Sequence, residues 1–527
     1  MTDAPIPSTI QTPATPTPAQ GSERREPPDK GSRPLAVVGW LAALVLLGVV
    51  IVLNQFGDAP AEETFQHVVP ENDAFGLSAK TFVKLARVSP MFETSSPMFA
   101  AEVAQSAKTP EDHIRAAIVN AELDSPEAGL KALDRREDVA AKFADTTPQP
   151  DGEVSPAAEP ISEPSPAEPA PHDDAAAKHA AQIETDKRIV RSVLTEGPLG
   201  LTSSDREAFE ARYGWFARLA LARELPPESA ERREVLAGGG QILAAVGLAL
   251  GIFFVALVGG LTAFVVMLTG ISRGQVKPAF VPPTPGGSIW IETAAIFIGS
   301  FVLLRVGTSL LAGQFGSDPP AWVGVVHLGA QWLLALVPLY PLVRGLSKQE
   351  WSRQIGLHTG RGFFREVGAG IYGYFAALPV LAAAMAVTVI IIFLRSALSG
   401  GPGGEAPAPP DNPIVDILSK AGPLELALLF SLAVVWAPLV EESIFRGAIF
   451  RQVRGRTGLA LAAIVSACMF GLMHGYDFFL LLPVTTIGFV FALMREWRGS
   501  LIPTITAHAL HNGVILTLGI LFLVGVR

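Results

Sequence analysis

Ionisable side chains interrupt the apolar segments in the last third of the chain. The stretch APLVEESIFRG at 437–447 places Glu441, Glu442 and Arg446 where a membrane helix should be apolar. A charge at such depth costs roughly 2.5–3.5 kcal/mol on insertion scales, so we expect these residues to have a function. Glu442 and Arg446 are four residues apart and share one helical face, where they can form an ion pair. Glu441 is rotated by about 100° from Glu442 and remains available for chemistry.

Two more polar groups follow in later apolar segments. His474 lies four residues after Phe470, and His508 and Asn512 are also four residues apart, so each pair shares a helical face. His511 points to the other flank of its helix. Polar residues within an apolar span usually face an interior cavity. Taken singly, each group also fits a structural role, as a buried ion pair or as an interfacial histidine.

The three groups together have the chemistry of a hydrolytic site. A carboxylate can take a proton from water, and an imidazole can orient that water, transfer protons or bind Zn²⁺. A second imidazole and an amide N–H can donate hydrogen bonds to a developing oxyanion. The chain has no H-E-x-x-H helix, which argues against zincins. Water- or metal-dependent hydrolysis within a membrane is therefore the predicted chemistry.

The helices that must position these residues belong to a chain of two unlike parts. Its 527 residues are 49% hydrophobic and 17% charged overall, but the polar residues concentrate in 1–34 and 57–235. A net charge of −9 with no Lys/Arg tract argues against a nucleic-acid partner. The single cysteine, Cys468, excludes an intramolecular disulfide and a CxxC metal site, and we expect it to be a small core residue.

The apolar segments predict an all-α fold, a polytopic transmembrane helical bundle of about nine spans. A helix needs about 20 residues to cross the hydrocarbon layer of roughly 30 Å. The first span is read as an uncleaved anchor, because its apolar stretch begins late and lacks an A-x-A cleavage site. The other spans are expected near 240–268, 289–311, 321–343, 367–394, 424–452, 458–475, 478–495 and 501–525. Within them, Glu292 and Arg305 are expected to form structural pairs, with each other or with neighbouring helices.

Four regions follow from these patterns. Residues 1–34 are rich in Pro, Thr and Ala and predict a disordered tail, and residues 35–56 form the anchor. Residues 57–239 predict a mostly helical soluble domain with a Pro/Ala-rich linker near 146–172. Residues 240–527 form the polytopic membrane domain. The soluble region contains no recognisable catalytic motif.

The charges of the loops indicate the orientation. With nine spans, the basic loops all fall on one side, and the loops on the other side are acidic or rich in Gly and Pro. Because cytoplasmic loops carry an excess of Lys and Arg, we expect a cytoplasmic N-terminus and an extracytoplasmic 57–239 region. The protein is thus expected to be a multi-pass integral membrane protein in contact with the lipid bilayer. Its Ala/Pro-rich composition suits a bacterial plasma membrane.

The ordered set E-E-x-x-x-R, F-x-x-x-H and H-x-x-x-N resembles the CPBP family, which comprises CAAX-type prenyl endopeptidases and their bacteriocin-processing and Abi-like bacterial relatives. The flanking text APLVEESIFRGAIF and GSLIPTITAHALHN is also similar to that family's first and last motifs. The resemblance covers about residues 422–516 and, more loosely, the bundle from 240 onwards. It implies a protease core at 422–516 with its site inside the bilayer.

By this resemblance the protein is an intramembrane endopeptidase that acts on a peptide or membrane-protein substrate. Glu441 would activate the hydrolytic water with help from His474. His508 and Asn512 would stabilise the tetrahedral oxyanion. The residues that hold the site together would be Glu442 and Arg446.

Three alternatives remain open at the level of sequence. Glu441, His474 and His508 could bind Zn²⁺ and leave its fourth position for water, although we favour a metal-free glutamate site with no cofactor. A non-enzymatic membrane scaffold or bacteriocin-immunity protein of the same fold is a second reading, against which the intact motifs weigh. A transporter could use the charges as a substrate or proton path, but it predicts inverted repeats, which the sequence does not show.

Overall fold

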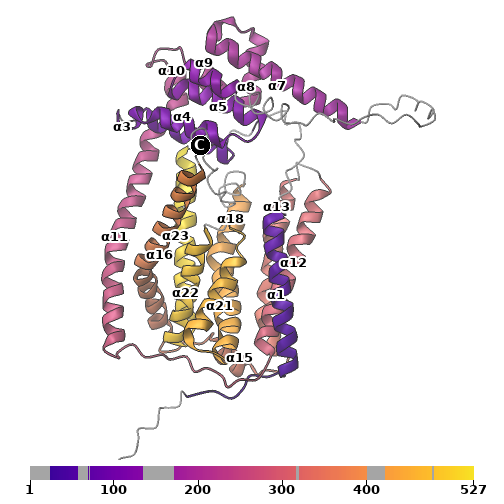
Figure 1. Ribbon diagram of the computed structural model, residues 1–527, viewed down its shortest axis with the longest axis vertical. Coiled ribbons are helices and arrows are strands. Elements are labelled where there is room, and N and C mark those ends of the chain that lie inside the picture. The colour runs from indigo at the N-terminus through magenta and orange to yellow at the C-terminus, as the bar shows by residue number, and fades with distance from the viewer. Residues whose placement is uncertain are drawn as a thin grey trace, which may run out of the picture.

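The computed structural model describes residues 24–56, 69, 72–88, 90–134, 171–315, 320–399, 422–476 and 480–526. In these ranges the regular structure is helical, apart from one isolated β-bridge between Glu26 and Pro283. The all-α fold class predicted from the apolar segments is confirmed. Figure 1 shows a bundle of long helices beneath a group of shorter ones.

Seven helices in the described ranges are long and apolar enough to cross a membrane. They cover Arg33–Asn54, Ala230–Ser272, Ile289–Gly313, Trp322–Val343, Phe363–Arg395, Pro423–Arg454 and Ile502–Leu521. The other two predicted spans are also helices, α21 (Leu459–Leu472) and α22 (Leu481–Arg498). α21 has only 14 residues, and α22 ends in a charged turn that contains Arg495, Glu496 and Arg498. The bundle is therefore polytopic as predicted, with two elements that differ from full-length spans.

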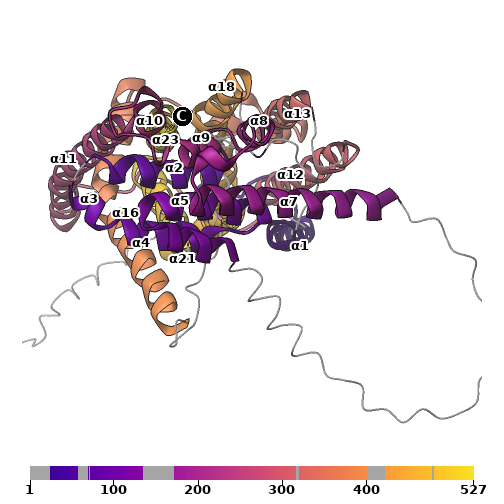
Figure 2. The same ribbon diagram turned by 90° about the horizontal axis from the view of Figure 1, so that it is seen from above.

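The chain runs up and down through the bundle. α1 (Arg33–Phe56) ascends towards the shorter helices, and α11 (Gly239–Ser272) descends from them (Figure 1). The C-terminus lies just below the shorter helices, at the end of the bundle opposite to the N-terminal segment, as an odd number of passages requires. The remaining long or connecting elements are α12 (Ile289–Gly313), α13 (Ala321–Ala330), η2 (Gln331–Leu339), α14 (Tyr340–Val343), α15 (Lys348–Ile355), α16 (Phe363–Ser399) and α23 (Ile502–Val526). Seen from above, α18, α21 and α23 lie between α11 and α16 on one side and α1, α12 and α13 on the other (Figure 2).

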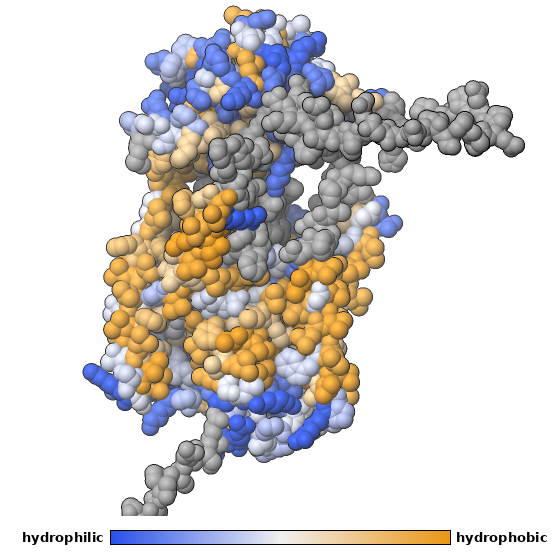
Figure 3. Space-filling model, in the orientation of Figure 1, coloured by the Kyte–Doolittle hydropathy of each residue, from blue (hydrophilic) through white to orange (hydrophobic). Residues whose placement is uncertain are grey.

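The surface of the bundle has the character that a lipid environment requires. On the face that Figure 3 shows, hydrophobic residues cover most of the bundle, and hydrophilic residues lie at its lower end and over the upper helices. On α21, Leu461 (51%) and Ile464 (49%) are exposed, and Cys468 continues their stripe at helical spacing. Cys468 is therefore on the outer face of its helix, and the prediction that it is a core residue is wrong.

The polar region between the first two spans folds into a helical group with its own hydrophobic core. Its helices are α2 (Ala74–Ala86), α3 (Pro90–Thr94), α4 (Ser96–Ser106), α5 (Pro110–Leu123), α7 (Pro171–Thr195), α8 (Ser203–Tyr213), α9 (Trp215–Ala222) and α10 (Ala230–Leu236), with another at 126–134. Leu77 packs with Ile242 of α11 and Leu516 of α23, so this group rests on the bundle. The linker predicted near 146–172 lies, up to residue 170, outside the described residues.

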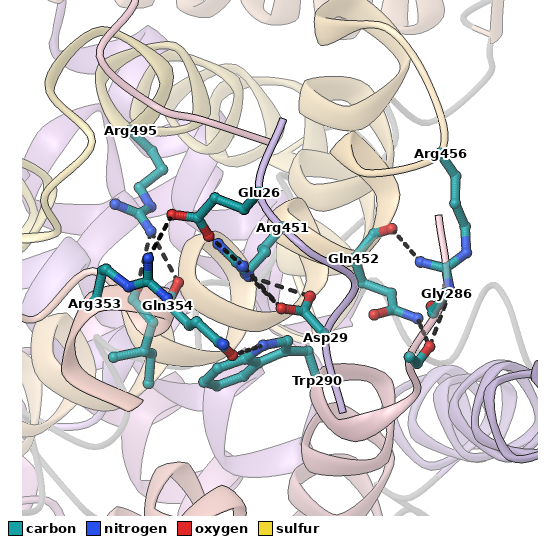
Figure 4. Close-up of polar contacts among 12 residues, drawn as sticks. Glu26, Asp29, Gly286, Trp290, Arg353, Gln354, Arg451, Gln452, Arg456 and Arg495 are labelled. Carbon is teal, nitrogen blue, oxygen red and sulfur yellow. Dashed lines mark hydrogen bonds and ion pairs between the residues drawn. The ribbon is translucent and has the colours of Figure 1, made fainter. Parts of the chain in front are cut away.

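Residues 24–32 form an ordered segment, here called the N-terminal strap, along the lower end of the bundle. Its backbone pairs with the segment before α12. Glu26 and Asp29 each place a carboxylate oxygen 2.8 Å from Arg451, which is almost completely buried (Figure 4). These two acids complement the basic end of the bundle, so the prediction of disorder over 1–34 does not hold for this part. The preceding residues of that range lie outside the described ones.

Candidate active site

The first candidate residues lie on an irregular helix. It consists of α18 (Pro423–Ser431), η3 (Leu432–Trp436), α19 (Ala437–Glu442), η4 (Ser443–Ile449) and α20 (Phe450–Arg454). η3 and η4 are π-helical, so a wide turn lies on each side of Glu441 and Glu442. Pro438 follows η3 and has no N–H to donate to the preceding turn, which favours such widening. π-Bulges change the direction of the side chains around them and occur often at functional sites.

Glu442 and Arg446 form an ion pair in the interior of the bundle, as the spacing predicts. Both side chains are fully buried, and Arg446 Nη1 donates to Glu442 Oε1 over 2.8 Å. Arg446 Nη2 donates to the carbonyl of Gly488 on α22 over 3.0 Å. The guanidinium also lies over the ring of Phe470, 4.3 Å from its centroid. The pair therefore joins the glutamate-bearing helix to α21 and α22 through contacts that would be lost if either charge were removed.

His508 of α23 lies against both glutamates. Its Nδ1 is 3.0 Å from Glu442 Oε1, and because a carboxylate accepts, Nδ1 carries the hydrogen. Its Nε2 is 4.0 Å from Glu441 Oε2, too far for a direct hydrogen bond but close enough for one water to bridge. Glu441 Oε2 is buried, and no group in the described part of the chain bonds to it. Glu441 thus presents a free carboxylate oxygen beside an imidazole nitrogen.

His474 reaches the same place from the turn that follows α21. Its Nδ1 donates to the carbonyl of Phe470 over 2.8 Å, so Nε2 is the acceptor nitrogen of the neutral ring. The Phe470 ring contacts both imidazoles, with centroids 4.5 Å from His474 and 5.8 Å from His508. The candidate residues of three helical elements therefore meet around this one aromatic ring.

The length of α21 explains how His474 stays at the level of the glutamates. A span of about 20 residues would carry the residue after it to the far surface of the membrane. The 14 residues of α21 rise only about 21 Å, so the turn that holds His474 remains inside the bundle.

Asn512 and His511 point to different neighbours, as their spacing predicts. Asn512 Nδ2 donates to the carbonyl of Ala433 in η3 over 2.8 Å, which leaves the second N–H of the amide for another acceptor. His511 Nδ1 lies 3.5 Å from the hydroxyl of Tyr374 on α16, and the two rings meet edge to face. Asn512 therefore faces the glutamate-bearing helix, whereas His511 faces away from it.

The comparisons with known proteins identify the segment that holds this site. Residues 423–514 match the model of the type II CAAX prenyl endopeptidase Rce1-like family. This segment is therefore similar to Rce1-like domains. The match begins at the first residue of α18 and ends two residues after Asn512, so it contains every candidate residue, and it confirms the resemblance to CAAX-type endopeptidases. No curated protein and no solved structure matches the chain.

Tyr476 is a further residue of the Rce1-like site, which helical spacing did not indicate. Its ring stacks on that of His474 with centroids 5.9 Å apart. The only signal in the sequence is its place two residues after His474, in a turn whose contacts are not periodic.

Whether a zinc ion fits the candidate site depends on how its donor atoms are arranged. A zinc ion needs about three side-chain ligands at roughly 2.0–2.2 Å. Among the residues that the structure describes, no three His, Cys, Asp or Glu side chains form such a group. The set Glu441, His474 and His508 therefore does not fit Zn²⁺ in this arrangement, and no reaction step is assigned to a metal.

Proposed function

We propose that the protein is an intramembrane endopeptidase that hydrolyses peptide bonds with a glutamate-activated water. The observation that carries this proposal is the buried, unbonded Oε2 of Glu441, 4.0 Å from Nε2 of His508. A buried carboxylate oxygen without a partner is costly unless a proton, a water or a ligand satisfies it. A water between this oxygen and this nitrogen would satisfy both atoms and would be held ready for deprotonation.

In the proposed reaction, Glu441 takes a proton from this water while the water oxygen attacks the carbonyl carbon of the scissile amide. His474 helps to orient the water through its acceptor nitrogen. The remaining N–H of Asn512 donates to the oxyanion. His508 donates as well when it enters the reaction as an imidazolium, with a hydrogen on each ring nitrogen before the water is deprotonated. Glu441 then passes the proton to the leaving nitrogen, the C–N bond breaks, and the products are a carboxylate and an amine.

Glu442 and Arg446 act as positioning residues in this proposal. The Oε1 atom of Glu442 accepts from both Arg446 and His508, so one carboxylate holds the imidazole and compensates the buried guanidinium. When His508 donates from Nε2, its Nδ1–H stays bonded to Glu442 and the ring keeps its orientation. Such support for a catalytic group is what maintains a productive geometry.

The Rce1-like match suggests peptide or membrane-protein substrates, and a prenylated CAAX terminus is the substrate that the family name implies. In a bacterial membrane we expect signal-peptide remnants or bacteriocin-like precursors ahead of prenylated proteins. Other membrane-associated peptides could undergo the same reaction. We place the N-terminal strap on the cytoplasmic side of a bacterial plasma membrane, because Arg353, Arg451 and Arg456 gather at that end (Figure 4) and basic residues are enriched on the cytoplasmic side. The 57–239 region is then extracytoplasmic.

The decisive experiment is the substitution Glu441→Gln, assayed on the full-length protein in lipid nanodiscs with a fluorogenic prenylated CAAX peptide. Because glutamine keeps the shape but cannot take the proton, we expect cleavage to fall about 100-fold or more with unchanged expression and melting temperature. Glu425→Gln is the matched control, since Glu425 lies on the same span and caps its first turn. Normal cleavage by Glu441→Gln would rule out the proposed role.

The same preparation separates the alternatives. A scaffold or immunity protein predicts that the wild type cleaves none of the peptides, and a transporter predicts uptake of a solute into liposomes without cleavage. Exhaustive chelation tests the metal question, and we expect the activity to persist. Loss of activity that added Zn²⁺ restores would assign the hydrolysis to a metal site instead.

A further inference from the structure

Arg305 on α12 is a charged residue of the bundle that the proposed mechanism does not use. Its guanidinium donates to the side-chain oxygen of Asn54 on α1, and no carboxylate of the described residues pairs with it. Glu292, the acid on the same helix, is instead bonded to Tyr340 and Arg344 near the lower end. A guanidinium within the membrane zone is costly without a counter-charge, so Arg305 is suited to receive an anionic ligand.

Arg305 faces the bundle rather than the lipid. The large exposed residues of the upper half of α12 form one stripe, Leu303 (74%), Val306 (37%) and Leu310 (65%). Since successive residues of a helix are rotated by about 100°, Arg305 lies roughly 130° from the middle of this stripe. Thr308 shares the inner side, is buried, and has its hydroxyl 2.9 Å from Nδ1 of His327 on α13. A polar strip therefore runs along the inner side of α12.

Asn54 links Arg305 to the turn that carries His474. Gly475, the next residue, has a φ of +67°, and a Cβ atom there would lie 2.9 Å from the amide of Asn54. The glycine therefore serves two purposes, because it permits the left-handed turn and lets α1 pack directly on it. Arg305 is thus separated from the turn that carries His474 by a single side chain.

We propose that Arg305 and Asn54 form a subsite that binds the free C-terminal carboxylate of the substrate. This inference rests on the proposed endopeptidase function. The planar guanidinium presents N–H groups in the geometry that a carboxylate accepts, and the NH₂ group of Asn54 is a further donor. Three extended residues span about 10 Å, so a terminal carboxylate a few residues beyond the scissile bond can reach a group beside the His474 turn. A lipid phosphate fits less well, because Arg305 is turned away from the lipid-facing stripe.

The test compares two peptides of one prenylated sequence, which end in a free carboxylate or in a carboxamide. Full-length protein is assayed in nanodiscs of uncharged phosphatidylcholine, and kcat/KM is measured for each peptide. We expect the wild type to prefer the free carboxylate about tenfold or more, because hydrogen bonds from Arg305 to a charged carboxylate are stronger than those to a neutral carboxamide. Arg305→Gln should bring the ratio close to one, mainly through KM, and Arg305→Lys should retain part of the preference.

The ratio is taken within one preparation, so a fraction of unfolded variant does not alter it. Arg344→Gln is the control. Arg344 follows α14 and pairs with Glu292 at the lower end of α12, so this variant should keep the wild-type ratio. Equal cleavage of both peptides by the wild type, or an unchanged preference in Arg305→Gln, overturns the subsite and leaves the endopeptidase intact. An equal loss on both peptides that depends on added anionic lipid would assign Arg305 to a lipid phosphate instead. If the wild type cleaves neither peptide, the proposed function fails and the subsite fails with it.

Discussion

Substituting Glu442 by glutamine should separate the structural from the chemical part of the Glu441–Glu442 pair. Among the described residues, Glu442 supplies the one carboxylate bonded to Arg446, so the change leaves that fully buried guanidinium with a carbonyl and aromatic ring faces. Removal of one partner from a buried ion pair costs about 3–5 kcal/mol, because the other charge stays desolvated. Glu441→Gln breaks no hydrogen bond of the described residues, so its cost should stay within about 1 kcal/mol.

The measurement is thermal unfolding in detergent, followed by intrinsic tryptophan fluorescence. At an unfolding entropy of about 2.1 cal/mol/K per residue, a loss of 3 kcal/mol corresponds to a fall in Tm of roughly 3–5 °C for Glu442→Gln, against little change for Glu441→Gln. Both variants should lose cleavage, the first through misplaced His508 and the second through the missing base.

A double variant checks the physical reason. Glu442→Gln with Arg446→Met removes the uncompensated charge as well, so it should recover a large part of the lost stability without restoring activity. Equal destabilisation by Glu441→Gln and Glu442→Gln would refute the division of roles. No recovery in the double variant would show that packing, rather than buried charge, sets the cost.

Two further substitutions test the elements around the site. Asp29→Asn removes a carboxylate bonded to the buried Arg451, so it should destabilise the protein by about 3 kcal/mol, measured as a lower Tm. Glu26→Gln should cost less, because the Glu26 side chain that also bonds Arg451 is partly exposed. An equal effect of the two would contradict this ranking. Gly475→Ala should lower kcat/KM by roughly 10- to 100-fold, because it strains the left-handed turn and displaces His474. Gly458→Ala, at the open start of α21, is its control, and normal cleavage by Gly475→Ala would contradict the role of the turn.

Periodicity along single helices was sufficient for part of the candidate site. The Glu442–Arg446 pair and the different directions of Asn512 and His511 follow from the spacing of these residues in the sequence, because each residue of a helix is rotated by about 100° from the one before. Seven of the nine predicted spans and the apolar character of the bundle follow from segment length and composition.

Contacts between distant segments could not be predicted in this way. The composition of the first 34 residues predicts a disordered tail. The N-terminal strap is ordered instead, because it contacts Arg451, which is more than 400 residues away in the sequence. The π-turns beside Glu441 depend on packing as well as on Pro438, and the place of Tyr476 depends on an irregular turn. In each case the structure depends on a contact between residues far apart in the sequence. Such a contact cannot be predicted from the spacing of residues within one helix.

The shortness of α21 has a consequence for solvent. Its rise of about 21 Å falls some 9 Å short of a hydrocarbon layer of roughly 30 Å, on the side that the helices from α2 to α10 cover. Above the proposed cleavage point, α21 therefore does not fill the hydrocarbon layer on the side of the upper helices. In the proposed reaction, we therefore expect water to reach Glu441, and the hydrophilic product to leave, from that side of the bundle.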